Sequence, residues 1–473
     1  MSTKSVVIAC DTFAPDRNGT ATFAKNLATS LQQEGYEVHV IAPATSKLYG
    51  TFRENHDGVA LVVHRLKSFR LPFQPVQRFV SPLGLARKLR GLIGAIAPDV
   101  IHIQSHLNIG HYAAGAARSA GIRLVATNHL DAENFIENVI MAPRFVKSFL
   151  ASLFMRSASD VFRSADAVIA PNLRAAQMLE SVIPNLKVFA VSGGVNLRSY
   201  RNLEPAKQAN HLIVYVGRLD REKHVYVMLE ALARLPKHLK LEVIGSGSQH
   251  SELLALAKEL KIESRVSFLD DLDNFEVAKR LGRATVFVMP STQELQSMAT
   301  LEAMAAGRPI VAANSMALPN LVEDGINGYL FKPDSPTDLA EKLEAIFKLD
   351  AKAFENLCHA SVVRASQHDL AKTVANYERI YAGLEPILSN MRSEGGYEAE
   401  PSVTTRIARL VRRGSKSLER GANGVIERLD GVRGAVSESF GEVRFVIERR
   451  SRRVARKLSS SFRKALERIR KDE

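Results

Sequence analysis

The chain carries two successive sets of short Val- and Ile-rich runs separated by helical patterns, and this order limits most strongly what it can fold into. The first set comprises Val6–Cys10, Val38–Pro43, Ala60–Leu66, Val100–Gln104, Arg123–His129 and Ala167–Asn172. The second comprises Leu212–Arg218, Lys240–Gly247, Arg265–Asp270, Thr285–Ser291, Pro309–Ala313 and Gly328–Pro333. Continuous apolar runs bounded by turns are typical of strands buried on both faces of a parallel sheet. We therefore predict an α/β protein with two Rossmann-like, doubly wound domains.

A polar connector rich in Gly, Pro and Asn separates the two sets. With 473 residues, the chain is longer than one hydrophobic core normally serves. We predict an N-terminal domain over residues 1–195 and a second domain over 196–385, which ends with a helix around Lys372–Leu384. Residues 386–473 form a separate tail. Parallel strands of such sheets end at one edge, where open α/β sheets bind their ligands.

Charge is unevenly distributed along the chain. The formal net charge is +14, and from residue 401 to 473 Lys and Arg outnumber Asp and Glu by 20 to 9, so the body is nearly neutral. The two cysteines, Cys10 and Cys358, lie far apart and lack metal-ligand spacing, which favours a reducing compartment and argues against a disulfide framework or a zinc site. The N-terminus shows no signal-peptide pattern and no apolar run is long enough to span a bilayer. We expect a cytoplasmic protein.

The strand predicted over Leu212–Arg218 ends in Gly217 and Arg218, and Lys223 follows closely. Glycine lets a ligand approach the backbone, and two cations at the head of a helix suit a diphosphate. An ordinary turn with solvated charges is the alternative for this motif taken alone.

The stretch Pro290–Asn314, PSTQELQSMATLEAMAAGRPIVAAN, contains a second candidate site. We expect a helix that starts near Gln296–Ser297 and stops at Gly307. The first N–H groups of such a helix, here those of Gln296, Ser297, Met298 and Ala299, have no partner within it and favour an anion. Glu302, on the second turn, can accept two hydrogen bonds from a vicinal diol such as ribose, and Glu294, in the turn before the helix, can do the same for a hexose. Helix solubility explains Glu302, and the helix dipole explains Glu294, if each is considered alone.

These two motifs, VGRLDREK and ELQSMATLEAMAAGRPIVA, resemble the family 4 retaining glycosyltransferases, which have the two-Rossmann GT-B fold. Their signature places two glutamates eight positions apart, followed by a Gly-x-Pro turn. The resemblance covers roughly residues 1–385. It implies that Glu302 holds the nucleotide ribose, Glu294 the hydroxyls of the donor sugar, and Arg218 and Lys223 the diphosphate. It also implies a metal-independent transfer in which a diphosphate oxygen takes the proton of the acceptor.

Two stretches of the first domain add to the candidate site. Gly19 and Thr20 lie between a strand and a helix start, where a glycine permits close approach of a phosphate or an acceptor. His129 ends a strand; a lone histidine is more often a structural hydrogen-bonding group than a catalyst. In the resemblance, His129 matches a histidine that contacts the donor sugar or the charge that develops in the transition state. His129 with Glu133 and Asn134 is similar to the subgroup that glycosylates diacylglycerol and related lipids, although Ala132 stands where that subgroup usually has a proline.

Two other patterns have simpler explanations. The acidic run Asp270–Asp273 looks like a metal-binding Asp-x-Asp, but the resemblance implies a diphosphate neutralised by helix dipoles and cations, so we interpret it as a loop edge. Gly245-x-Gly247 is interpreted as a tight turn. We expect no metal and no cofactor, with UDP-glucose or GDP-mannose as the donor substrate.

The tail has an eleven-residue apolar period, exemplified by Val425, Val436, Ile447, Leu458 and Ile469. Eleven residues are about three helical turns, so this period keeps one narrow apolar stripe along a helix. Flanking Arg and Lys favour a basic amphipathic helix that folds on an anionic membrane. A coiled coil and unspecific nucleic-acid binding are the alternatives, the latter being less favoured. The basic segments His64–Phe79, Leu85–Ile93 and Pro143–Ser157 suit the same surface, or are solvated helix faces.

We therefore predict a peripheral enzyme at the inner face of the cell membrane that moves glucose or mannose onto a lipid or lipid-linked acceptor. A transferase with a soluble sugar acceptor is the first alternative. A non-catalytic scaffold would not need Glu294, Glu302, Arg218 and Lys223 together, and an epimerase would not need an acceptor pocket.

Overall fold

The computed structural model describes residues 4–16, 18–71, 74–129, 156–203, 207–270 and 272–387. The predictions for Glu133, Asn134 and residues 401–473 lie outside this part of the chain. No helix in the described ranges combines the length and the apolar character that crossing a membrane requires.

The first domain is built on a sheet with strand order β10-β9-β8-β7-β1-β2-β4-β3. Its strands are β1 (Ser5–Ala9), β2 (Glu37–Pro43), β3 (Gly50–His56), β4 (Val59–Leu66), β7 (Val100–Ile103), β8 (Arg123–Thr127), β9 (Ala167–Ala170) and β10 (Val188–Ala190). All pairings are parallel except that of the edge strand β3 with β4. The inner strands β1 and β7 are almost completely buried, as continuous apolar runs predict.

Helices α1 (Gly19–Gln33), α2 (Leu85–Ile96), α3 (Asn108–Ala120) and α6 (Leu173–Val182) connect these strands, and a hairpin of β5 (Ser68–Leu71) and β6 (Gln74–Val80) follows β4. Helix α1 starts where it does because the side chain of Asn18 accepts a hydrogen bond from Ala21 N at 2.9 Å. Asn172 caps α6 in the same way, through Ala175 N at 2.8 Å. Both caps follow a β strand of the parallel sheet, so the helix N-termini lie at the carboxyl edge of the sheet.

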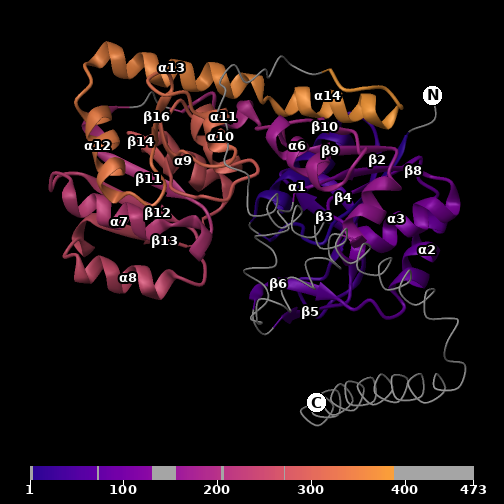
Figure 1. Cartoon of the computed structure of the whole chain (residues 1–473). Coiled ribbons are helices and arrows are strands. Elements are labelled where there is room, and N and C mark those ends of the chain that lie inside the picture. Colours follow the sequence, from indigo (N-terminus) through magenta and orange to yellow (C-terminus); the bar gives the residue numbers. More distant parts are fainter. Residues whose placement is uncertain are drawn as a thin grey trace, which may run out of the picture. The chain divides into compact units, whose positions relative to one another are not determined.

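The second domain is built on an all-parallel sheet with strand order β13-β12-β11-β14-β15-β16. Its strands are β11 (Leu212–Val216), β12 (Lys240–Ile244), β13 (Val266–Leu269), β14 (Val286–Met289), β15 (Ile310–Ala313) and β16 (Gly328–Phe331). The accompanying helices are α7 (Val225–Arg234), α8 (His250–Glu259), α9 (Asn274–Arg283), α10 (Met298–Ala305), α11 (Leu318–Leu321), α12 (Pro336–Phe347) and α13 (Ala351–Gln367), with short 3-10 turns η1 (Leu197–Tyr200), η2 (Gln208–Asn210), η3 (Arg221–Lys223) and η4 (Glu263–Arg265). Figure 1 shows these helices around the second sheet.

Helix α14 (Leu370–Tyr381) follows α13 but packs on the first domain (Figure 1). Its Tyr377 and Tyr381 belong to one hydrophobic cluster with Val6, Ile8 and Phe23 of the first domain. The backbone bonds Val195 N–H to His368 O (2.8 Å) and Leu370 N–H to Val195 O (3.0 Å) tie the connector to the start of this helix. The chain therefore returns to its first domain after completing the second.

All twelve strands predicted from the apolar runs are present, and the prediction of two Rossmann-like domains is confirmed. The predicted C-terminal helix corresponds to α14. Four strands in the described part of the chain were not predicted: the polar edge strand β3, the two hairpin strands β5 and β6, and the three-residue strand β10.

Candidate active site

The loop after β11 is fixed by close backbone packing. Tyr215, which is buried, donates a hydrogen bond from its hydroxyl to Arg218 O at 2.8 Å. Gly245, with φ +135°, lies so close to this loop that a Cβ at its position would sit 2.0 Å from Gly217 O. A Cβ at Gly247 would sit 2.4 Å from the carbonyl carbon of Leu219. The Gly245-x-Gly247 turn thus gives the neighbouring loop the room it needs.

The cations predicted to hold a diphosphate are paired with carboxylates. Lys223 Nζ lies 2.6 Å from Glu294 Oε1, and the side chains are only 15% and 11% exposed. Arg218 donates to Glu222 Oε1 at 2.6 Å and is also paired with Asp220. Asp220 in turn accepts from Ser248 N–H at 3.0 Å, so it joins the loops that follow β11 and β12. A ligand that recruits these cations must share them with their acidic partners or replace those partners.

Helix α10 begins as predicted, with Ser297 as its N-cap. Ser297 Oγ accepts a hydrogen bond from Thr300 N–H at 3.3 Å and from Thr300 Oγ1–H at 2.8 Å. The N–H groups of Met298 and Ala299 make no hydrogen bond to another described residue. The side chain of Gln296 is occupied, because its Oε1 accepts from Gly193 N–H at 2.7 Å and its Nε2–H donates to Ser192 Oγ at 2.9 Å. It therefore ties the start of α10 to the connector between the domains.

Glu302 lies on the second turn of α10 and its carboxylate makes no hydrogen bond within the described part of the chain. Burial raises the pKa of Glu302 to about 7, and the charge of Lys25 on α1 opposes this rise. Lys25 is itself paired with Asp57. The pKa of Tyr200 in η1 is raised by burial and by the proximity of Glu302. Glu302 is thus a carboxylate that is desolvated but free to accept hydrogen bonds from a ligand.

The loop before α1 approaches α10. Asn18 caps α1 and also donates from Nδ2 to Thr12 Oγ1 at 2.9 Å. Gly19, the first residue of α1, is exposed, and a Cβ at its position would lie 3.9 Å from Met298 Cγ. Thr20 is half-buried. The structure therefore brings the predicted glycine contact of the first domain to the start of α10.

His129 follows β8 and is held in one orientation. His129 Nε2 lies 2.9 Å from Gln104 Oε1, and an amide oxygen only accepts, so Nε2 carries the proton and Nδ1 has a free lone pair. Its ring packs against Phe23, with ring centroids 4.8 Å apart. Burial lowers the pKa of His129 to about 4, so the ring is neutral at neutral pH. It can accept a hydrogen bond from a sugar hydroxyl through Nδ1.

A buried polar network continues from Gln104 to α14. Gln104 Nε2 lies 3.3 Å from His102 Nε2, and His102 Nδ1 lies 2.7 Å from the hydroxyl of Tyr381. Thr127 Oγ1 joins the network at 2.7 Å from His102 Nε2 and 3.0 Å from the Tyr377 hydroxyl. Burial lowers the pKa of His102 to about 3. The last described helix thus helps to fix the orientation of His129 through two intermediate side chains.

Sequence reasoning missed Asp220, Glu222, Lys25 and Gln104. The acids Asp220 and Glu222 stand in the same motif as Arg218, and their alternation with cations was a usable signal. Lys25 lies in an otherwise mostly apolar stretch of α1, and eight residues of that helix are buried. Gln104 ends the apolar run at β7, just as His129 ends the run at β8.

Within the described ranges, no group of three or more His, Cys, Asp or Glu side chains is arranged to hold a metal ion. Asp273, in the acidic run, serves as the N-cap of α9 and accepts a hydrogen bond from Glu276 N–H at 2.8 Å.

Comparison with known proteins assigns the chain to a family. A model of "Glycosyltransferase Family 4" matches residues 17–199, and a model of "Glycosyl transferases group 1" matches residues 198–360. The chain belongs to the family 4 glycosyltransferases of the GT-B fold. It is therefore a transferase enzyme.

Individual relatives agree with this assignment. A GDP-mannose-dependent alpha-mannosyltransferase of Mycolicibacterium smegmatis is 29% identical over 70% of this chain and 84% of the relative. An alpha-monoglucosyldiacylglycerol synthase of Streptococcus pneumoniae is 23% identical over 78% of this chain and 89% of the relative. The Anabaena protein HepE, solved with UDP and glucose, has the same fold, with a TM-score of 0.63 and 18% identity over 80% of this chain and all of HepE.

Proposed function

We propose that this glycosyltransferase moves a hexose from a nucleotide diphosphate sugar to a membrane lipid, with retention of the anomeric configuration. The observation that carries the proposal is the Lys223–Glu294 pair, which joins a cation suited to a diphosphate and a carboxylate suited to sugar hydroxyls at 2.6 Å. When the donor binds, Glu294 accepts from the sugar and Lys223 turns to the diphosphate. The ion pair is then exchanged for two interactions with the same ligand.

The other side chains complete a donor site. Glu302 accepts hydrogen bonds from two ribose hydroxyls, and its ionised form serves best because both of its oxygens are then acceptors. Arg218 and the free N–H groups of Met298 and Ala299 add positive charge where the leaving diphosphate develops negative charge. No metal ion is needed for this neutralisation.

His129 and the leaving group itself supply the remaining chemistry. The Nδ1 lone pair of the neutral ring accepts a hydrogen bond from a hydroxyl of the donor sugar and so orients the ring of that sugar. The acceptor hydroxyl attacks the anomeric carbon on the face from which the diphosphate leaves. A diphosphate oxygen takes the acceptor proton. Because attack and departure occur on the same face, the new glycosidic bond keeps the configuration of the bond that breaks. Holding both substrates together supplies the proximity that this step requires.

The acceptor is inferred from the relatives and from the charge of the chain. One relative is named for making a glucosyldiacylglycerol, and this chain carries its basic excess in residues 401–473. A basic segment attracts an anionic bilayer. Both observations support a location on the inner face of the cell membrane, where nucleotide sugar and lipid meet.

The proposal is tested by measuring sugar transfer from UDP-glucose and from GDP-mannose in parallel. Each donor is offered with diacylglycerol in neutral detergent micelles, and in a second series with soluble hexoses. Product formation with one donor and diacylglycerol, giving an α-linked glycolipid from the α-linked donor, is expected. Transfer to soluble hexoses alone would overturn the lipid acceptor, and a β-linked product would overturn retention.

A further inference from the structure

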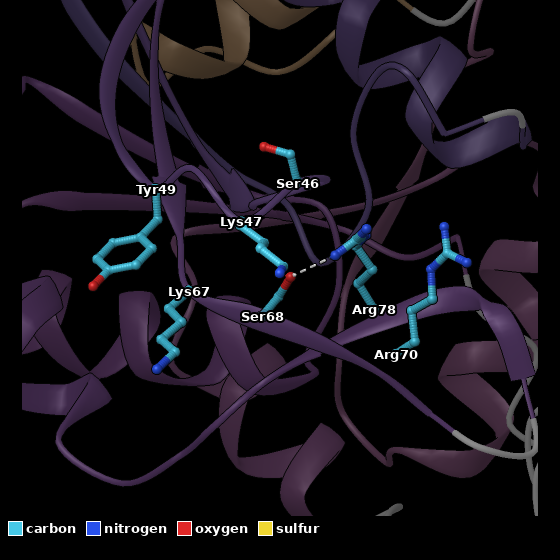
Figure 2. Close-up of a pocket in the computed structure, with 7 residues that line it drawn as sticks. All are labelled: Ser46, Lys47, Tyr49, Lys67, Ser68, Arg70 and Arg78. Atoms are coloured by element: carbon cyan, nitrogen blue, oxygen red, sulfur yellow. Dashed lines mark hydrogen bonds between the residues drawn. The ribbon is translucent and has the colours of Figure 1, made fainter. Parts of the chain in front are cut away.

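A cavity of about 400 Å³ lies in the first domain, apart from the site described above. It is lined by Ser46, Lys47, Tyr49, Lys67, Ser68, Arg70 and Arg78 (Figure 2). These residues come from the loop after β2 and from the hairpin after β4, so the cavity lies where two parallel strands end. We call it the hairpin pocket.

The lining of the hairpin pocket is strongly basic. Of the seven lining residues that the structure describes, four are cations and none is acidic. No ion pair joins Lys47, Lys67 or Arg70 to an acid in the described part of the chain, in contrast to the cations near β11. These three side chains are exposed and free to meet a ligand.

Arg78 gives the pocket a fixed wall. Its guanidinium donates to Thr45 O and lies 3.5 Å from Ser68 Oγ, while Ser68 Oγ–H donates to Ala44 O at 2.5 Å. The charge of Arg78 also acts on Asp16. Figure 2 shows Lys47, Ser68 and Arg78 converging, with Lys67 and Arg70 farther out. One preorganised cation and three adaptable ones suit a phosphate group.

Large apolar side chains stand beside these cations. Leu48, next to Lys47, is 71% exposed, and Phe69, next to Arg70, is 50% exposed. Tyr49 in the lining is 55% exposed. A soluble anion needs no such neighbours, whereas exposed apolar side chains among cations are the pattern of a surface that enters the boundary of an anionic bilayer.

We propose that the hairpin pocket binds the phosphate of an anionic membrane lipid, while the neighbouring apolar side chains enter the bilayer surface. This lipid is a neighbour of the acceptor and not the acceptor itself. The inference deepens the proposed function and rests on it for the presence of a membrane. Its consequence is that the first domain, and not the tail alone, contacts the bilayer.

The first test follows the amine reactivity of individual lysines in the full chain by acylation and mass spectrometry. Vesicles of phosphatidylcholine are compared with vesicles that also contain phosphatidylglycerol. Lys47 and Lys67 are expected to lose most of their reactivity only on the phosphatidylglycerol vesicles, while Lys352 in the second domain keeps its reactivity. Unchanged reactivity of Lys47 and Lys67 on vesicles that bind the protein would overturn the proposal.

Glycerol 3-phosphate without vesicles distinguishes the two sources of the phosphate. At the same phosphate concentration it is expected to leave both lysines reactive, because it lacks the acyl chains that the apolar side chains contact. Protection by glycerol 3-phosphate alone would show a site for a soluble phosphate and overturn the lipid assignment.

The second test compares two double variants of the full chain. Lys67→Ala/Arg70→Ala removes two pocket cations, and Arg53→Ala/Arg118→Ala removes two exposed cations outside the pocket. The first is expected to lower partition onto phosphatidylglycerol vesicles by about 30-fold, at about fivefold per basic residue near the surface, and the second by less than about twofold. Equal losses in both would mean that only net charge counts, which contradicts a defined pocket.

An activity measurement separates this inference from the proposed function. In neutral detergent micelles with diacylglycerol, Lys67→Ala/Arg70→Ala is expected to transfer sugar as the unmodified enzyme does, because no anionic lipid is present. Loss of transfer there would show that these residues serve the reaction itself, which would overturn the pocket as a separate lipid site. Wild-type inactivity would instead count against the proposed function.

Discussion

The two sides of the candidate site are built on opposite principles. In the second domain, Lys223 and Arg218 are charged and each is paired with a carboxylate. In the first domain, His129 is neutral and belongs to a hydrogen-bonded network of uncharged groups that includes Gln104. The first arrangement provides cations that a ligand can bind. The second holds a neutral ring in a fixed orientation.

This difference matches the two tasks of a sugar transfer. A leaving diphosphate needs positive charge, and paired cations avoid the cost of leaving charges buried and unpaired before the donor arrives. The reacting sugar needs orientation, and a neutral ring held through Gln104 loses little entropy when it binds a hydroxyl. Variants of both domains test whether charge and orientation are divided between them in this way.

The largest expected effect is that of Glu294→Gln. The variant keeps the size of the side chain but removes the charge partner of Lys223 and weakens the hydrogen bonds to the sugar. We expect kcat for transfer to fall by about 10²- to 10³-fold. Glu259→Gln, at an exposed position on α8, serves as the control and should behave as the unmodified enzyme. Activity within a few-fold of the unmodified enzyme would remove Glu294 from the site.

The next largest effect concerns the neutrality of His129. Gln104→Glu places a carboxylate where Oε1 now lies 2.9 Å from His129 Nε2. A neighbouring negative charge raises the pKa of a histidine, so His129 would become protonated as the pH falls toward neutrality. We expect kcat of the variant to drop by about tenfold below its new pKa and to recover at higher pH.

The unmodified enzyme provides the reference for that pH profile. Its His129 has a pKa of about 4 and is neutral at higher pH, so this residue causes no fall in kcat near neutral pH. A purely structural role for Gln104 would lower activity equally at every pH, and that result would contradict the positioning of His129.

A smaller effect is expected at Glu302. Its pKa of about 7 means that the carboxylate becomes protonated as the pH falls through 7, so the KM for the donor should rise below that pH. Glu302→Gln should raise KM by about tenfold, because hydrogen bonds to a charged acceptor are worth about 1.5–3 kcal/mol, and should remove the pH dependence. A KM for the variant that still changes near pH 7 would assign that ionisation to another group.

Glu302 should also affect stability in the opposite sense. A carboxyl whose pKa rises on folding, here from 4.5 to about 7, destabilises the fold increasingly as the pH rises between these values. Glu302→Gln should therefore be more stable than the unmodified enzyme at pH 8, by about 1–3 kcal/mol. Chemical denaturation at pH 8 and at pH 4.5 measures this difference, which should nearly vanish at the lower pH.

The last effect concerns stability alone and comes from buried neutral histidines, in the network of the first domain and elsewhere in the structure. Burial lowers the pKa values of His64, His106, His129 and His368 to about 4 and that of His102 to about 3, against 6.5 in an unfolded chain. The unfolded chain then binds more protons, so stability is lost as the pH falls from about 6.5 toward 4. Denaturation midpoints that stay constant over this window would show that these histidines are not buried as neutral groups.

The sequence alone indicated the parallel strands of both sheets, because strands buried on both faces consist of uninterrupted runs of Val and Ile. The edge strand β3, Gly50–His56, was not predicted because six of its seven residues are polar or glycine. Only one face of an edge strand needs an apolar partner, so such a strand lacks an uninterrupted apolar run. The hairpin strands β5 and β6 were not predicted because this segment contains Pro75, and a proline within a run argues against a central strand.

The site was predictable where it depends on one local motif. The N-cap Ser297 and the turn that separates Glu294 from Glu302 follow from helix-capping chemistry. The pairing of Lys223 with Glu294, 71 residues apart, did not follow, because it depends on how two βα loops of one sheet meet. The link from His102 to Tyr381, 279 residues apart, depends on the return of α14 to the first domain.

The division of labour between the two domains is tested most directly by calorimetric titration of UDP and GDP. The titrations compare the unmodified enzyme with Lys223→Ala, His129→Ala and the control Lys240→Ala, which changes an exposed cation at the start of β12. We predict that Lys223→Ala weakens binding of the preferred nucleotide by more than about tenfold, as the loss of a charge-assisted contact implies, while the other two variants bind as the unmodified enzyme does. Normal binding by Lys223→Ala, or a comparable loss in His129→Ala, would contradict the account.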